Sequence, residues 1–137
     1  MGLILDTSTL IDSERRREGV EDILRRIRAV HGEIDIAIST VSVVELSHGI
    51  YRARTEADSM RRRIFAEGVF HGLIVHPVTL DIAQLAGRIE GEQAAKGITI
   101  DFEDLVIGAT ALHLGFDVAT TNVKHFQRIP GLNVVTL

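Results

Sequence analysis

Short apolar runs alternate along the chain with longer segments in which apolar residues recur every three or four positions. The short runs are typical of buried strands, and the longer periodic segments are typical of helices with one apolar face. Strands are expected at residues 3–5, 34–39, 73–78, 118–120 and 133–136. Helices are expected at residues 7–12, 20–30, 42–54, 56–70, 80–96 and 101–114.

This alternation predicts an α/β fold in which a parallel sheet carries helices on both faces. Pro77 cannot donate a hydrogen bond to a neighbouring strand, so the strand at 73–78 is expected at an edge of the sheet. The helix at 101–114 is largely apolar, which indicates a central, buried position. A chain of 137 residues with no repeat or linker fits a single domain spanning residues 1–137.

Three acidic residues lie where such a fold places chemistry. Asp6 directly follows the first strand, Glu45 lies one turn into the helix after the second strand, and Asp104 lies in the first turn of the helix at 101–114. Strand ends and the following helix starts share one edge of a parallel sheet, so these acids can converge there. Clustered carboxylates need a cation, and oxygen ligands favour Mg²⁺ or Mn²⁺. The pattern therefore predicts a metal site.

Two of these acids also fit a structural role. The spacings from Ser42 to Glu45 and from Asp101 to Asp104 match a capping box, in which an acid satisfies backbone donors at a helix start. Taken singly, either acid fits capping better, although a helix start also favours the ionised form that a metal ligand needs. Asp6 has no comparable role, because a carboxylate buried at a strand end is costly without a partner. Taken together, the three acids favour a functional site.

Charge and composition bear on whether the protein binds nucleic acid. The net charge of −4 argues only weakly against a nucleic-acid partner. Thirteen of the fifteen basic residues are arginines, most of them in the first half, and guanidinium groups suit phosphate. Acidic residues interleave with them, so most of these arginines are expected on solvated helix faces.

The absence of cysteine excludes disulfides and thiolate chemistry. A strand that starts at residue 3 leaves no visible signal peptide. No apolar run approaches the roughly 20 residues that a membrane helix needs. A cytoplasmic protein is expected.

Five segments resemble the motifs of PIN-domain ribonucleases, in order and over nearly the whole chain. They are residues 3–8 (LILDTS), 38–46 (ISTVSVVEL), 104–111 (DLVIGATA), 120–126 (TTNVKHF) and 129–132 (IPGL). Length and motif order are most similar to the VapC toxins of bacterial and archaeal toxin–antitoxin pairs. The resemblance implies an α/β/α sandwich with five parallel strands in the order 3-2-1-4-5, and a homodimer. It also implies a Mg²⁺- or Mn²⁺-dependent endoribonuclease that acts on RNA and is inhibited by a VapB-like antitoxin.

Carried over by position, the resemblance makes the three acids Asp6, Glu45 and Asp104 the metal ligands. It gives supporting roles to three hydroxyl side chains: Thr7, Ser8 and Thr120. Asn122 joins the catalytic set but departs from relatives with a fourth acid there, which leaves open whether one or two metals bind. Lys124 and His125 lie near this edge, where they could contact phosphate, but His125 is rather expected to be a loop residue packed beside Phe126.

The expected chemistry is hydrolysis by a metal-activated water, which needs no 2′-hydroxyl and leaves 5′-phosphate and 3′-hydroxyl ends. One alternative is a catalytically weak PIN module that binds RNA or the antitoxin. Another is an aspartyl-phosphate enzyme, but the hydrolase form usually has a second aspartate two residues after the first, where this chain has Ser8.

Overall fold

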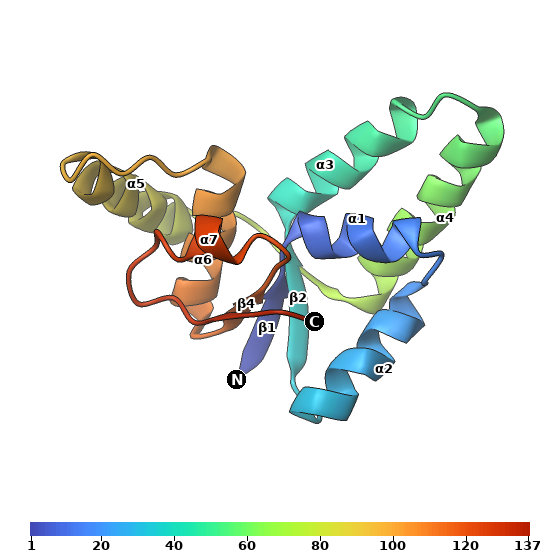
Figure 1. Ribbon diagram of the computed structural model, residues 1–137, viewed down its shortest axis with the longest axis horizontal. Coiled ribbons are helices and arrows are strands. Elements are labelled where there is room, and N and C mark those ends of the chain that lie inside the picture. The colour runs from blue at the N-terminus through green and yellow to red at the C-terminus, as the bar shows by residue number, and fades with distance from the viewer.

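The computed structural model describes residues 1–137 and contains five strands and seven helices (Figure 1). The strands are β1 (Gly2–Leu5), β2 (Asp35–Ser39), β3 (Ile74–His76), β4 (Asp117–Ala119) and β5 (Val134–Val135). The helices are α1 (Thr7–Arg15), α2 (Val20–His31), α3 (Thr40–Tyr51), α4 (Glu56–Gly72), α5 (Leu80–Ala94), α6 (Phe102–Leu114) and α7 (Val123–Phe126). Every predicted strand and helix forms, and α7 is an additional element.

The five strands form one parallel sheet in the order β3-β2-β1-β4-β5, as predicted. β1 occupies the centre, where Leu3 pairs with Ile36 of β2 on one side and with Asp117 of β4 on the other. β3 lies at an edge and ends at His76, directly before Pro77. Because all strands run the same way, the carboxyl ends of β1, β2 and β4 meet at one edge of the sheet.

Side chains of the central strand point alternately into two cores. Leu3 and Leu5 belong to the core under α1, α2, α3 and α4, and Ile4 belongs to the core under α5, α6 and α7. These two groups of helices lie on opposite sides of the sheet (Figure 1). All three side chains are fully buried, and burying each one stabilises the fold by roughly 1.5–3 kcal/mol.

Helix α3 follows β2 without a loop. Ser39 ends the strand and caps the helix, because its Oγ accepts a hydrogen bond from the backbone N–H of Val41 at 3.2 Å. The helix therefore begins at Thr40, two residues earlier than predicted, and Ser42 lies inside it. The capping box considered for Glu45 is thus wrong, and this acid lies in the second turn of α3.

Helix α6 has the buried position that its apolar composition predicts. Every residue from Leu105 to Ala111 is buried. The helix ends at Leu114, and Gly115 follows with a φ of 70°, a left-handed conformation that glycine adopts at little cost. No helix, α6 included, is long and apolar enough to cross a membrane.

Helix α7 was not predicted from the sequence, because four residues carry no helical period. It follows β4 and is anchored by Phe126, which is fully buried in the core beneath α5 and α6. This anchor places the preceding residue, His125, at the edge of the sheet where the strands end.

The first residue of β1 has no room for a side chain. A Cβ at Gly2 would lie 2.6 Å from the ring of Phe116 and 2.7 Å from the carbonyl oxygen of Asp35. We expect Gly2→Ala to lower the free energy of unfolding by about 1–3 kcal/mol, because the backbone oxygen cannot yield. Gly87→Ala, on the exposed side of α5 with no atom within 4 Å, should raise it by about 0.5–1 kcal/mol. Urea unfolding measures both changes, and an unaltered Gly2→Ala protein would contradict the close packing.

Candidate active site

The three predicted acids converge at the edge of the sheet where β1, β2 and β4 end. Asp6 connects β1 to α1, Glu45 comes from α3, and Asp104 lies in the first turn of α6. Burial raises the pKa of Glu45, and the carboxylates of Glu103, Asp6 and Asp104 raise it further. Residues 39 to 98 positions apart in the chain therefore share one electrostatic environment.

Asp6 is held by two neutral donors. Its side chain is nearly inaccessible, and its Oδ2 accepts hydrogen bonds from Ser8 Oγ at 2.6 Å and from Thr120 Oγ1 at 2.8 Å. Hydroxyl donors orient a carboxylate without neutralising it. Its Oδ1 accepts no hydrogen bond from the protein, so this oxygen is available to a cation.

A chain of hydroxyl groups holds Glu45. Thr7 Oγ1 lies 2.7 Å from Glu45 Oε1 and 2.8 Å from Ser42 Oγ. A hydroxyl has one proton to donate, and the carboxylate is the stronger acceptor. Thr7 therefore donates to Glu45, and Ser42, which is fully buried, donates in turn to Thr7. Among the effects on the pKa of Glu45, burial dominates and raises it, and the Thr7 hydrogen bond opposes that rise.

Asp104 is the most strongly perturbed acid of the site. Burial raises its pKa to about 6, the Asp6 carboxylate contributes to the rise, and His125 opposes it. Its side chain is only 13% exposed, and its Oδ2 lies 3.3 Å from Nδ1 of His125. Asp101 is the N-cap residue of α6 as the spacing suggested, but its side chain makes no capping hydrogen bond.

The structure corrects the reading of His125. It was expected to be a loop residue packed beside Phe126, but it lies in α7 and contacts Asp104. Ligand atoms of Asp101, Asp104 and His125 all lie within 4.8 Å of one another, whereas Asp6 and Glu45 do not belong to this closely spaced group. Sequence reasoning missed this group because its geometry depends on α7, which has no sequence period.

Asn122 stands at the N-cap of α7 with an exposed side chain that makes no hydrogen bond. Its backbone joins the site instead. Its N–H donates to Thr120 Oγ1 at 2.9 Å, and its carbonyl accepts from the N–H of His125 at 3.1 Å. The catalytic role expected of the Asn122 side chain stays a prediction.

The donors gathered here fit a hard divalent cation. They are carboxylate oxygens, and their charge is penalised by burial and mutual repulsion, as the raised pKa values of Glu45 and Asp104 indicate. A bound cation removes both penalties. Oxygen donors of this kind favour Mg²⁺ or Mn²⁺, and the chain has no cysteine to favour a softer metal.

Comparison with known sequences agrees with this geometry. The family model of the PIN domain matches residues 3–132. Ribonuclease VapC1 of Rickettsia felis is 32% identical over 137 residues, which cover 100% of this chain and 97% of that protein. The tRNA(fMet)-specific endonuclease VapC of Salmonella typhimurium is 30% identical over 131 residues, covering 96% of this chain and 94% of that protein.

Solved structures agree as well. DNA-bound VapBC from Salmonella typhimurium contains a chain with a TM-score of 0.84 and 27% identity, covering 99% of this chain and 98% of that one. DNA-bound VapBC2 from Rickettsia felis matches the fold with a TM-score of 0.81 at 23% identity and the same coverage. The order of the sheet, the converging acids and these likenesses lead to one conclusion. The chain belongs to the PIN domain family and, within it, to the VapC proteins.

Proposed function

We propose that this protein is a metal-dependent endoribonuclease, the toxin of a type II toxin–antitoxin pair. The observation that carries the proposal is the convergence of Asp6, Glu45 and Asp104 from three separate elements into one repulsive cluster. The relatives compared above are named as a ribonuclease and an endonuclease, which supports RNA as the substrate.

In the proposed reaction the three carboxylates hold Mg²⁺ or Mn²⁺. Three hydroxyl side chains keep the carboxylates in position: Thr7, Ser8 and Thr120. When bound, the cation supplies a Lewis acid that activates water and offsets the charge of the phosphodiester. His125 holds Asp104 through Nδ1, so this carboxylate keeps its orientation toward the cluster. Hydrolysis by water leaves 5′-phosphate and 3′-hydroxyl ends.

The proposal extends to partners. The structural neighbours are VapBC complexes, which supports a VapB-like antitoxin for this chain. Clustered carboxylates suit an arginine supplied by such a partner, because a guanidinium group binds them through two parallel hydrogen bonds. We also propose a homodimer in the cytoplasm, as expected from the family resemblance.

Removing one carboxylate tests the site directly. We expect Asp6→Asn, Glu45→Gln and Asp104→Asn each to lower kcat/KM for RNA cleavage by at least about 100-fold, because each removes a charged ligand of the cation. EDTA should abolish cleavage by the parent protein, and Mg²⁺ or Mn²⁺ should restore it. Glu90→Gln, which neutralises an exposed acid of α5 that does not act on Glu45 or Asp104, is the control and should keep its activity. Full cleavage in EDTA would contradict the metal mechanism.

The raised pKa of Asp104 predicts how metal-free stability depends on pH. The folded protein holds the Asp104 proton more tightly than the unfolded chain does, whose pKa is near 3.8. The stabilisation from protonated Asp104 is therefore complete below pH 3.8 and is lost as pH rises through about 6. In EDTA, the melting temperature of the parent should fall between pH 4 and 6, and that of Asp104→Asn should not show this fall. Identical pH profiles for parent and variant would contradict the assignment.

Asn122 offers a test of metal stoichiometry. We expect Asn122→Asp to bind a second Mn²⁺ more tightly, because a carboxylate attracts the cation more strongly than an amide oxygen does. Its metal-free stability should fall slightly through repulsion and recover when Mn²⁺ is added. Isothermal titration with Mn²⁺ measures both sites. If the variant and the parent give the same isotherm, Asn122 lies outside the metal site.

A further inference from the structure

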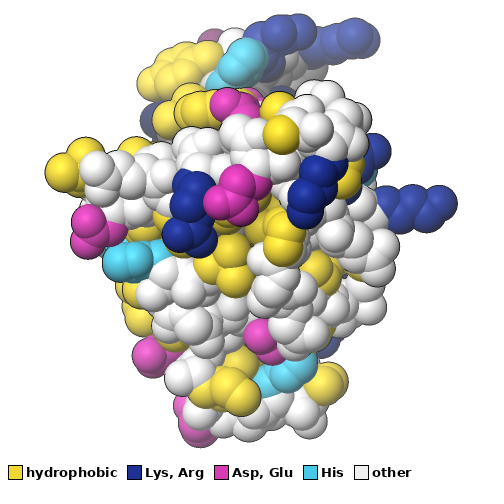
Figure 2. Space-filling model, turned by 90° about the vertical axis from the view of Figure 1, so that its left-hand side faces the viewer, with side chains coloured by type: hydrophobic (Ala, Val, Ile, Leu, Met, Phe, Trp, Pro, Cys, Tyr) yellow, Lys and Arg dark blue, Asp and Glu magenta, His cyan; other side chains and the backbone are white.

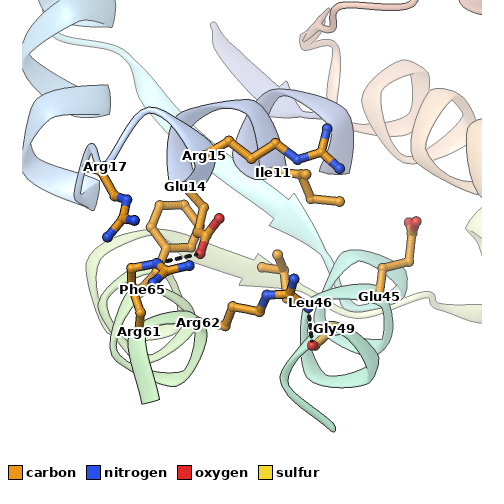
Figure 3. Close-up of a pocket in the computed structure, with 10 residues that line it drawn as sticks. All are labelled: Ile11, Glu14, Arg15, Arg17, Glu45, Leu46, Gly49, Arg61, Arg62 and Phe65. Atoms are coloured by element: carbon orange, nitrogen blue, oxygen red, sulfur yellow. Dashed lines mark hydrogen bonds and ion pairs between the residues drawn. The ribbon is translucent and has the colours of Figure 1, made fainter. Parts of the chain in front are cut away.

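Four arginine side chains line one cleft beside the acids. The cleft has a volume of about 310 Å³ and lies between α1 on one side and α3 with α4 on the other (Figure 3). Arg15 and Arg17 reach it from the end of α1 and the turn after it, and Arg61 and Arg62 reach it from α4. Glu45 lines one end of the same cleft, so the cleft borders the proposed metal site at this acid.

The cleft has an excess of positive charge. Two carboxylates, Glu14 and Glu45, share it with the four guanidinium groups. Glu14 is occupied by Arg61, whose Nε lies 3.5 Å from Glu14 Oε1 (Figure 3). Arg15 and Arg17 are exposed and form no ion pair with any carboxylate of the chain. Two positive charges beside the acid cluster are therefore free for an anionic ligand.

Several other arginines follow the sequence expectation of solvated, mixed-charge surfaces. Those in the first half with acidic partners are Arg16, Arg25, Arg26 and Arg28. Figure 2 shows the other side of the molecule, over α5, α6 and α7, where basic, acidic and apolar side chains are also interspersed. The cleft differs from such a surface because four arginine side chains line one hollow between α1, α3 and α4.

The backbone of Arg17 adds an independent observation. This residue has a φ of 62°, in the left-handed region where a β-carbon is crowded. The other residues of the chain with positive φ are all glycines: Gly32, Gly97, Gly115 and Gly131. A glycine would make the turn between α1 and α2 with less strain. An arginine at this position therefore indicates a functional role for its side chain.

We infer that the cleft binds the phosphate backbone of the RNA next to the bond that is cut, with Arg17 as a phosphate-positioning residue. The inference rests on the proposed function, because a strand that runs from the metal site along Glu45 enters this cleft. Guanidinium groups bind phosphate oxygens through paired hydrogen bonds. The strained turn directs one such group at the RNA.

Arg17→Gly separates this role from a structural one, because it moves stability and binding in opposite directions. The variant should melt about 2 °C higher than the parent, since the strain is removed. It should bind a fluorescein-labelled single-stranded RNA in EDTA about 5- to 10-fold more weakly. The slope of log Kd against log salt concentration should fall by about 0.7, the value for one lost phosphate contact on a single strand.

Arg54→Gly is the matched control. Arg54 is an exposed arginine in the turn between α3 and α4, outside the cleft, and the change removes the same charge. Its RNA affinity and salt slope should equal those of the parent. In Mg²⁺, Arg17→Gly should raise KM by the same factor as Kd and leave kcat unchanged, whereas Arg54→Gly should change neither.

Three results discriminate the alternatives. A lower melting temperature for Arg17→Gly with unchanged RNA affinity would make Arg17 structural and overturn the inference. The inference would also be wrong if Arg17→Gly bound RNA as tightly as the parent but bound a polyglutamate peptide more weakly. The cleft would then be assigned to an acidic protein segment. If the parent fails to cleave RNA in Mg²⁺ but binds it in EDTA in an Arg17-dependent way, the endonuclease proposal fails while the cleft stands as an RNA site.

Discussion

Repulsion among carboxylates that the fold forces together is the constraint on which this molecule depends. Asp6 follows the central strand, and the parallel sheet directs the ends of its neighbours to the same edge. Glu45 and Asp104 are consequently brought into one partly dry region, where burial and like charge raise the pKa of each. The two hydrophobic cores must offset this cost. Hydroxyl donors hold Asp6 and Glu45, and His125 contacts Asp104.

Most of the fold could be predicted because its signals are local. Apolar runs and helical periods identified every strand and all the helices except α7, and Pro77 placed β3 at an edge. Boundaries shifted where a single contact decided them, as at Ser39, whose side chain caps α3 before the periodic segment begins. The order of the strands came from the family resemblance, since local patterns carry no information on which strands pair.

The candidate site, like the fold, could be predicted from the sequence only in part. Asp6, Glu45 and Asp104 could be proposed from their places after strands and at helix starts, and the structure brings them together. The contact between His125 and Asp104 could not be predicted, because it depends on how the short helix α7 packs through Phe126. The backbone conformation of Arg17 could not be predicted either, since its φ depends on how the chain turns between two helices.

The hydroxyl chain from Ser42 through Thr7 to Glu45 makes one acid dependent on the spacing between two helices. Thr7 is the first residue of α1, and its partners both lie on α3. The cleft with the arginines opens between the same helices. The position of the Glu45 carboxylate therefore depends on how α1 packs against α3 as well as on α3 itself. The packing of α1 against α3 is thus part of the site, although the hydroxyl groups that join the two helices carry no charge.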